Sequence, residues 1–206
     1  MYTWTPPAQS TVSAPTPPDT PTPAPPTATP TPTVAQPAPA AVPPKAVGQV
    51  YVVGDSLTVG SEADLTELLE NSGIPVSIDA QVGRGSDEGV ALFDSATGKA
   101  SPVWVSALGT NDDDSVDAAL GRIDRLMGMA GGKTVFWLTL VRPGGDYGAV
   151  NSAVKQKVGQ YPNLHIVDWA SYVGQHRNWQ EGDGVHLTAE GYAARAAYIV
   201  GALQQF

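Results

Sequence analysis

The stretch Gln49-Val-Tyr-Val-Val-Gly-Asp-Ser-Leu57 decides the fold and also points to the chemistry. Its first five residues are mostly apolar and β-branched, which predicts a buried strand over 49–53. Gly54 and Asp55 then interrupt the strand pattern and leave Ser56 at its carboxyl end. A serine presented there could act as a nucleophile if a neighbouring base took its proton. Taken alone, the motif is explained equally well by an ordinary turn followed by a helix cap.

Strand and helix patterns alternate along the rest of the chain. Apolar runs predict four further strands, over 75–80, 102–108, 134–140 and 164–168. Helical spacing predicts helices over 61–71, 116–126, 149–160 and 188–203. A further short helix is expected after Ser86, which would cap it, and Asp114 is the expected cap of the 116–126 helix. Apolar strands alternating with helices are typical of a parallel sheet covered on both faces. We therefore expect an α/β fold, a three-layer α/β/α flavodoxin-like arrangement with a five-stranded parallel sheet.

A base and its partner for Ser56 are offered by Asp183-Gly-Val-His186, between the fifth strand and the last helix. Three residues of separation let a carboxylate orient the imidazole that deprotonates a serine, as in a Ser-His-Asp triad. The competing interpretation is a solvated loop ahead of a helix. His165 lies inside a strand pattern and His176 in a polar loop, so both are weaker candidates for the base.

An acyl-transfer site also needs N–H donors for the oxyanion that forms during the reaction. The side-chain amide of Asn111, in the Gly-Thr-Asn turn after the third strand, is one candidate. The backbone N–H groups of Ser56 and of the Gly83-Arg-Gly85 turn are others. Ligands of parallel sheets bind at the carboxyl ends of the strands, so these loops are expected to gather at one edge. The prediction of an acyl-transfer site rests on the presence of all these residue types in one chain.

Over residues 46–206 the chain resembles the SGNH (GDSL-type) hydrolase superfamily in the order and spacing of four motifs. These are Gly-Asp-Ser-Leu, the glycine turn, Gly-Thr-Asn-Asp and Asp-Gly-Val-His-Leu. The resemblance implies Ser56, Asp183 and His186 as catalytic residues, with Ser56, Gly83 and Asn111 as the oxyanion hole. Gly85 could also match the family's oxyanion glycine; Gly83 is preferred because it comes first and precedes an arginine. The Val-Gly-Arg and Val-Asp-Trp runs are also similar to the extracytoplasmic SGNH domains of peptidoglycan O-acetyltransferases.

Residues 1–45 differ sharply from this domain. Of the chain's 19 prolines, 15 precede Lys45, together with 10 threonines and a single charged residue, Asp19. Such a segment buries too little apolar surface to offset the entropy of ordering, so we expect a disordered Pro/Thr/Ala-rich linker over 1–45. No secretory signal and no transmembrane segment are visible in the sequence. Pro/Thr spacers are common on exported proteins, which favours an extracellular or cell-wall location.

Charge and composition exclude several other functions. The formal net charge is −9, which disfavours binding to nucleic acid. The chain has no cysteine, so disulfides and thiolate metal sites are excluded. Asp112-Asp-Asp114 could suggest a cation, but a solvated loop is the better interpretation, and Asp183 with His186 lacks an evident third metal ligand. We expect no metal and no cofactor.

The sequence therefore predicts an SGNH-type esterase or O-acyltransferase that works through an acyl-serine intermediate. The expected partner is an acyl ester, of cell-wall peptidoglycan or another carbohydrate, and a monomer is the working expectation. Whether water or a carbohydrate hydroxyl accepts the acyl group is open. One alternative is a non-catalytic carbohydrate-binding module that retains the fold. Another is a lipase or thioesterase, which the lack of a long apolar lid segment makes weaker.

Overall fold

The structure, a computed structural model, describes residues 48–206. The linker predicted over 1–45, and its boundary at residue 46, lie outside the described residues. Five strands form one sheet in the order β2-β1-β3-β4-β5, and every pair of neighbours is parallel. The strands are β1 (Val50–Gly54), β2 (Val76–Ala80), β3 (Val103–Ala107), β4 (Thr134–Leu138) and β5 (Leu164–Val167). This is the flavodoxin-like order, and the predicted fold class is confirmed.

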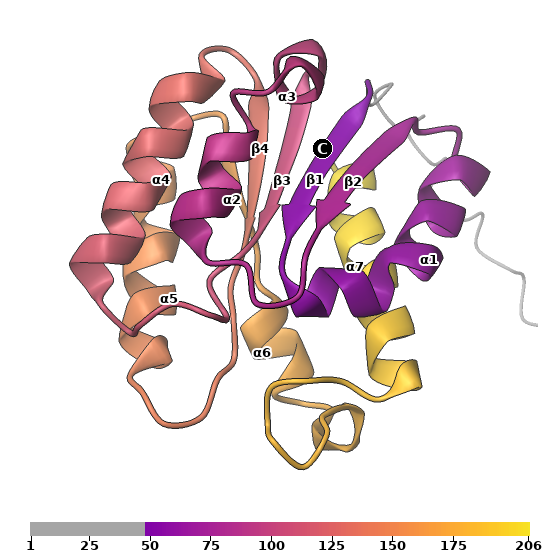
Figure 1. Ribbon diagram of the computed structural model, residues 1–206, viewed down its shortest axis with the longest axis vertical. Helices are drawn as coiled ribbons and strands as arrows, with labels where there is room; N and C mark the ends of the chain where they lie inside the picture. Colours follow the sequence, from indigo (N-terminus) through magenta and orange to yellow (C-terminus); the bar gives the residue numbers. More distant parts are fainter. Residues whose placement is uncertain (1–47) are drawn as a thin grey trace, which may run out of the picture. The chain divides into compact units, whose positions relative to one another are not determined.

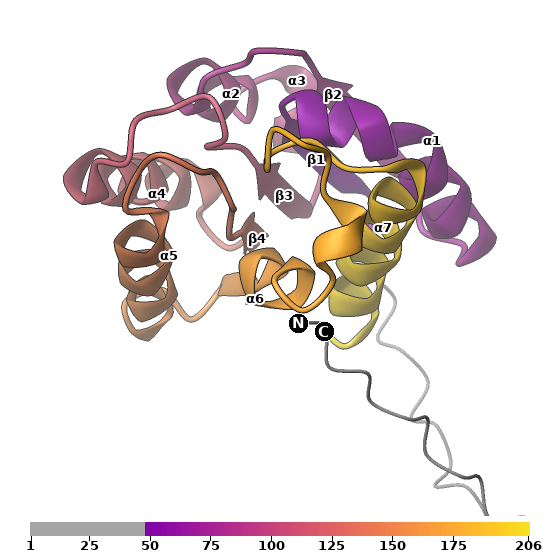
Figure 2. The same ribbon diagram turned by 90° about the horizontal axis from the view of Figure 1, so that it is seen from below.

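Helices cover both faces of the sheet (Figures 1 and 2). One face carries α1 (Ser56–Asn71) and α7 (Ala189–Gln204). The other carries α2 (Ser86–Leu92), α4 (Val116–Ala130) and α5 (Tyr147–Gln156). Short elements complete the chain: α3 (Ala96–Ala100), η1 (Lys157–Gly159), α6 (Trp169–Val173) and η2 (Arg177–Trp179). None of the helices within 48–206 is long and apolar enough to cross a membrane.

Strand β1 shows why the sheet is buried on both sides. Val50 and Val52 pack into one apolar cluster with side chains of α1 and α7, whereas Tyr51 and Val53 pack into a second cluster with side chains of α2, α4 and α5. All four residues are at most 3% exposed. Successive side chains of a strand point to opposite faces, so a run that is apolar at every position requires cover on both.

The first helix differs from its prediction. It was expected to start at Ser61 but begins five residues earlier, at Ser56 itself. Asp55 caps it, because one carboxylate oxygen accepts the backbone N–H of Leu57 at 3.0 Å. The early turn has no regular apolar spacing, and burial against α7 stabilises it instead. Ser56 therefore sits at the amino end of a 16-residue helix.

Two predicted helix caps are wrong by one residue. Gly85, and not Ser86, is the capping position of α2, and the Ser86 N–H is accepted by the carboxylate of Asp112 at 2.9 Å. Ser115 caps α4 through its hydroxyl, while Asp114 accepts the N–H of residue 146. In both cases the residue expected as the cap bonds a more distant loop instead, Ser86 through its backbone N–H and Asp114 through its carboxylate. The short helices α3 and α6 were also not predicted, because five residues give too little periodicity.

Candidate active site

The predicted triad residues come together at the carboxyl edge of the sheet, where the strand arrows point in Figure 1. Ser56 Oγ lies 3.1 Å from His186 Nε2. His186 Nδ1 lies 2.7 Å from Asp183 Oδ2. The side chains of His186 and Asp183 are 46% and 51% exposed. The three groups are thus arranged in series, hydroxyl to imidazole to carboxylate, at an open surface.

The loop that carries Asp183 and His186 is closed by its own hydrogen bonds. Gln180 and Leu187 form an isolated antiparallel bridge, and the Glu181 N–H donates to the His186 carbonyl at 2.8 Å. Asp183 Oδ1 accepts two backbone N–H groups, those of residues 185 and 186, both at 2.9 Å. One carboxylate oxygen therefore shapes the turn while the other faces the imidazole.

Hydrogen bonding keeps the Asp183 carboxylate ionised. Its bond to the His186 side chain, followed by the two backbone N–H bonds, lowers the pKa of Asp183 from 3.8 to about 2. An ionised carboxylate can only accept a hydrogen bond, so His186 Nδ1 must carry the proton that faces it. In the neutral imidazole Nε2 is then left as an acceptor, which is the form a base needs to receive the Ser56 proton.

The three predicted oxyanion donors belong to adjoining segments. Ser56 is the first residue of α1, where backbone N–H groups have no partner inside the helix. Within residues 48–206, no hydrogen bond occupies the N–H of Ser56 or of Gly83. The Asn111 amide donates to the Arg84 carbonyl at 3.0 Å, which fixes the amide beside the glycine turn and leaves its second N–H available.

The backbone separates the two candidate glycines of the turn. Gly83 has φ +78°, a conformation that side-chain-bearing residues rarely adopt, and nothing lies within 4 Å of the position a Cβ would take. Gly85 has φ −79° and caps α2. Any residue can adopt the conformation of Gly85, whereas Gly83 requires glycine. Gly83 is therefore the glycine that this turn requires, and its role as an oxyanion donor stays a prediction.

Comparison with solved structures identifies this architecture. The chain is similar to the C-terminal catalytic domain of Streptococcus pneumoniae peptidoglycan O-acetyltransferase A, with TM-score 0.63 and 23% identity over 78% of this chain and 94% of that one. It is also similar to a structure assigned to the SGNH hydrolases, from Slackia heliotrinireducens (TM-score 0.57, 16% identity, 78% of this chain, 100% of that one). The chain has the SGNH fold. The resemblance seen in the sequence is confirmed.

Sequence relatives of this SGNH-fold chain carry related names. It is 26% identical over 174 residues to peptidoglycan O-acetyltransferase OatA of Listeria monocytogenes, covering 81% of this chain and 26% of the relative. It is 28% identical over 153 residues to O-acetyltransferase OatA of Staphylococcus aureus, covering 72% of this chain and 24% of the relative. The chain thus spans about a quarter of the length of these relatives. No family model matches the chain. These comparisons support the expected esterase or acyltransferase class of enzyme.

Beneath the nucleophile, the SGNH fold buries two charged residues that sequence reasoning did not assign to the site. Asp55 is fully buried, and its second carboxylate oxygen accepts the Thr110 N–H at 3.3 Å, which ties the nucleophile turn to the Asn111 loop. Arg195 of α7 is 2% exposed and donates to the Leu57 carbonyl and to Ser61 Oγ, at 3.3 and 2.9 Å. Burial lowers the pKa of Arg195 to about 10, and the charge of Asp55 opposes that shift.

Arg142 also supports the site. Its Nη1 donates to the carbonyls of Thr110 and Asp112 at 2.9 and 2.7 Å, and so holds the loop that presents Asn111. The sequence analysis did not assign Arg142 to the site. A signal was present, because Arg142 lies in the loop after a strand of a parallel sheet, among the other loops that follow strand ends.

The remaining histidines lie elsewhere. His165 is on β5, where its ring packs against those of Phe136 and Phe206 at 5.2 and 4.4 Å, and burial lowers its pKa. His176 stacks on Trp179 with ring centroids 3.8 Å apart. Neither replaces His186 beside Ser56. Among the described residues, no group of three or more His, Cys, Asp or Glu side chains is placed to hold a metal ion.

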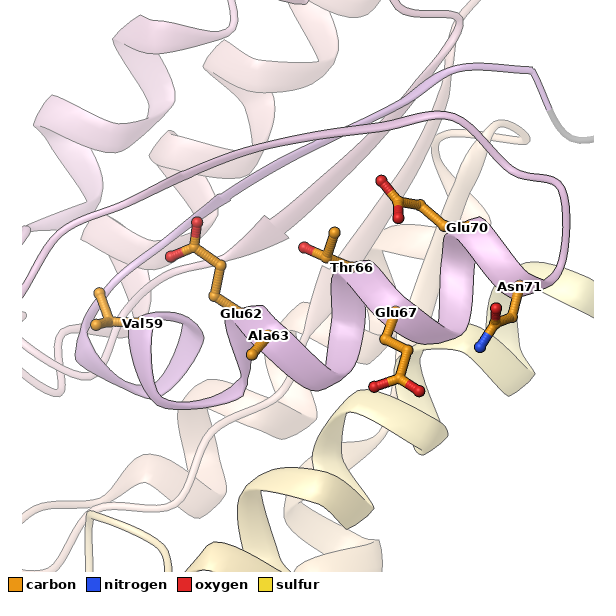
Figure 3. Close-up of a pocket in the computed structure, with 7 residues that line it drawn as sticks. All are labelled: Val59, Glu62, Ala63, Thr66, Glu67, Glu70 and Asn71. Atoms are coloured by element: carbon orange, nitrogen blue, oxygen red, sulfur yellow. The ribbon is translucent and has the colours of Figure 1, made fainter.

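An open groove of about 590 Å³ runs along α1, starting one turn beyond Ser56 (Figure 3). It is lined by Val59, Glu62, Ala63, Thr66, Glu67, Glu70 and Asn71. Figure 3 shows carboxylates on both sides of the helix axis, so this surface is anionic. None of the triad or oxyanion residues lines it.

Proposed function

We propose that residues 48–206 form the catalytic domain of a serine-dependent enzyme that transfers an acetyl group to or from cell-wall carbohydrate. The observation that carries the proposal is the chain of contacts from Ser56 through His186 to Asp183, at 3.1 and 2.7 Å. A fold retained only for binding sugar would not need these three groups in series. The names of the relatives, peptidoglycan O-acetyltransferases, support the choice of substrate and an extracytoplasmic site of action.

The geometry supports the following first half of the proposed reaction. Ser56 Oγ attacks the ester carbonyl while its proton passes to His186 Nε2. Asp183 stabilises the resulting imidazolium, and the N–H groups of Ser56, Gly83 and Asn111 stabilise the oxyanion. His186 then returns the proton to the leaving alcohol, the carbon–oxygen bond breaks, and an acyl-Ser56 ester remains.

In the second half, an incoming hydroxyl gives its proton to His186 and attacks the acyl-Ser56 carbonyl. The bond between the acyl carbon and Ser56 Oγ then breaks, and His186 returns the proton to Ser56, which frees the enzyme and releases the acylated acceptor. Water as acceptor makes the enzyme an esterase, and a carbohydrate hydroxyl makes it an acetyltransferase. The exposed position of Asp183 and His186 suits an acceptor that is part of a large polymer, because such a chain can lie across an open edge without being enclosed.

Turnover of p-nitrophenyl acetate by wild type, Ser56→Ala and Ser152→Ala tests the mechanism. Ser152 is an exposed serine of α5 and serves as the matched control. We expect Ser56→Ala to lose activity by about 10³-fold or more, and Ser152→Ala to keep it. Mass spectrometry of quenched wild type should find one acetyl group on the peptide containing Ser56. Equal turnover by wild type and Ser56→Ala would rule out the serine mechanism.

A second measurement separates the possible products. Adding a muropeptide or a chito-oligosaccharide to the acetyl donor should give an acetylated sugar if the enzyme is a transferase. Release of free acetate alone would indicate an esterase. A preference for long acyl chains would favour a lipase or thioesterase. Sugar binding without ester cleavage by wild type would favour the non-catalytic alternative.

A further inference from the structure

Arg84 is a buried cation that the triad does not use. Its side chain is 5% exposed although it follows the exposed Gly83. Nη1 donates to two backbone carbonyls, those of Gly54 at 3.1 Å and Asp79 at 2.6 Å. Nη2 donates to Asp79 Oδ1 at 2.8 Å, and Nε lies 3.6 Å from Glu88 Oε1. The guanidinium group is thus held by several acceptors in fixed positions.

These acceptors lie where the pairing of β1 with β2 ends. Val53 pairs with Asp79 and Gly54 with Ala80, and no later pair is formed. The guanidinium group bridges the two strand ends at that point. Gly54 is two residues before Ser56, so one end of the bridge holds the strand that delivers the nucleophile.

The main chain of Arg84 reaches the other two oxyanion donors. Gly83 directly precedes Arg84 in the chain. The Arg84 carbonyl accepts a hydrogen bond from the Asn111 amide at 3.0 Å. Gly83 is therefore joined to Arg84 by one peptide bond and Asn111 by one hydrogen bond, while Ser56 follows two residues after Gly54, whose carbonyl accepts from the Arg84 side chain. We propose that Arg84 is a positioning residue that sets the relative places of the three oxyanion N–H donors. This inference rests on the proposed function.

Arginine suits this task better than other cations. Its planar fork directs several N–H donors at once toward acceptors on different strands, and its charge is matched here by Asp79 and Glu88. A lysine ammonium carries its donors on a single nitrogen, so it cannot hold the two carbonyls and the Asp79 carboxylate together in the fixed geometry that Nη1 and Nη2 provide. An alanine would leave the Gly54 carbonyl without its side-chain partner and free the turn to shift.

Loss of the bridge should slow the chemical step more than it weakens substrate binding. Removing one oxyanion donor costs about 10²–10³-fold in kcat, so displacing the donors should cost about 10–100-fold. The Asp183–His186 pair is not in contact with Arg84, so the pH dependence of the remaining activity should keep the wild-type shape. A purely structural role would lower the melting temperature and the amount of folded enzyme, without lowering kcat per folded molecule.

The experiment compares Arg84→Ala, Arg84→Lys and Lys133→Ala in p-nitrophenyl acetate turnover, with concentrations corrected for folded protein. Lys133 is the control, because its ammonium group also donates to two backbone carbonyls, those of Lys99 and Ser101. These residues precede β3 and β4, so they lie at the amino edge of the sheet, opposite the site. We expect both Arg84 variants to lose kcat with KM changed less than threefold, and Lys133→Ala to keep kcat. Millimolar guanidinium should restore part of the activity of Arg84→Ala, and none to Ser56→Ala.

The outcomes are separable. Arg84→Lys keeps a cation at the position, so it remains informative if Arg84→Ala fails to fold. Wild-type kcat in folded Arg84→Lys, or a kcat loss in Lys133→Ala as large as in the Arg84 variants, would overturn this inference. If Ser56→Ala retains turnover, the proposed function itself fails. If Ser56→Ala is inactive while the Arg84 variants change only the melting temperature, the function stands and the role of Arg84 does not.

Discussion

At the scale of single residues, Asp183 has two tasks, one for each carboxylate oxygen. Oδ1 holds the turn through two N–H groups and Oδ2 faces His186. Both sets of bonds favour the ionised form. The depressed pKa follows from them and not from burial, since the side chain is half exposed.

The pKa of Asp183 is directly measurable. The ¹³C resonance of its carboxyl group should titrate with a midpoint of about 2, below the ordinary 3.8. Because the pKa is depressed in the folded state, this group stabilises the fold above pH 3.8, and the contribution is lost as the pH falls toward 2. His186→Ala removes the largest cause and should move the midpoint upward. A wild-type midpoint near 3.8 would contradict the hydrogen-bond geometry.

The candidate site residues that the sequence predicted are those that local motifs reveal. Asp183 and His186 are three positions apart, and Ser56 follows a strand, so both features could be read locally. Arg84 and Arg195 could not be assigned in this way, because each bonds a carbonyl beside Ser56 that is distant in sequence, that of Gly54 for Arg84 and that of Leu57 for Arg195. Arg195, for example, bonds residues more than 130 positions away.

At the scale of elements, Gly54 lets α1 start directly at the end of β1. A Cβ on Gly54 would lie 2.0 Å from Thr58 Oγ1 and 2.3 Å from Thr58 Cβ. Thr58 is fully buried in the first turn of α1, so it has little room to move. The absent side chain of Gly54 is thus what allows the nucleophile turn to fold back on its strand.

Substituting two glycines by alanine should have opposite effects. Gly54→Ala should destabilise the fold by about 1–3 kcal/mol through overpacking and lower kcat, because it displaces the turn that bears Ser56. Gly121 lies within α4, and a Cβ there has nothing within 4 Å. Gly121→Ala should stabilise by about 0.5–1 kcal/mol and leave kcat unchanged. Urea unfolding and ester turnover measure both. Equal effects of the two substitutions would contradict this account of Gly54.

Strands were predicted more closely than helices for a physical reason. All five are apolar runs buried on both faces, and their bounds differ from prediction by two residues at most. The first turn of α1 has weak periodicity and is stabilised by packing on α7, which is far away in sequence. The caps of α2 and α4 were misplaced because distant loops bond the expected cap residues: Asp112 accepts the Ser86 N–H, and the N–H of residue 146 donates to Asp114.

At the scale of the whole molecule, charge is the dominant surface property. The chain carries 20 acidic and 11 basic residues, which gives a net charge of −9. Exposed carboxylates also line the α1 groove one turn beyond Ser56. A field of this sign opposes the approach of anionic substrates and has little effect on neutral ones.

Ionic strength should therefore affect two ester substrates differently. We expect kcat/KM for p-nitrophenyl hemisuccinate, an anion, to rise as salt is added, since screening acts over about 10 Å at 0.1 M. The value for neutral p-nitrophenyl acetate should stay within about twofold and serves as the control. Stopped-flow measurements between 10 and 300 mM salt, roughly the range over which the Debye length falls from 30 to 6 Å, test this. A rate for the anionic ester that is independent of salt would contradict it.

The contact between Ser56 and His186 has a consequence for folding. The two residues are 130 positions apart, so the site exists only after nearly the whole domain has closed into one loop. Closing long loops is slow and belongs to the late part of folding. Regain of ester turnover after dilution from denaturant should therefore not precede the formation of the sheet. We therefore expect partly folded forms of this domain to be inactive, and activity to appear only once the whole domain has folded.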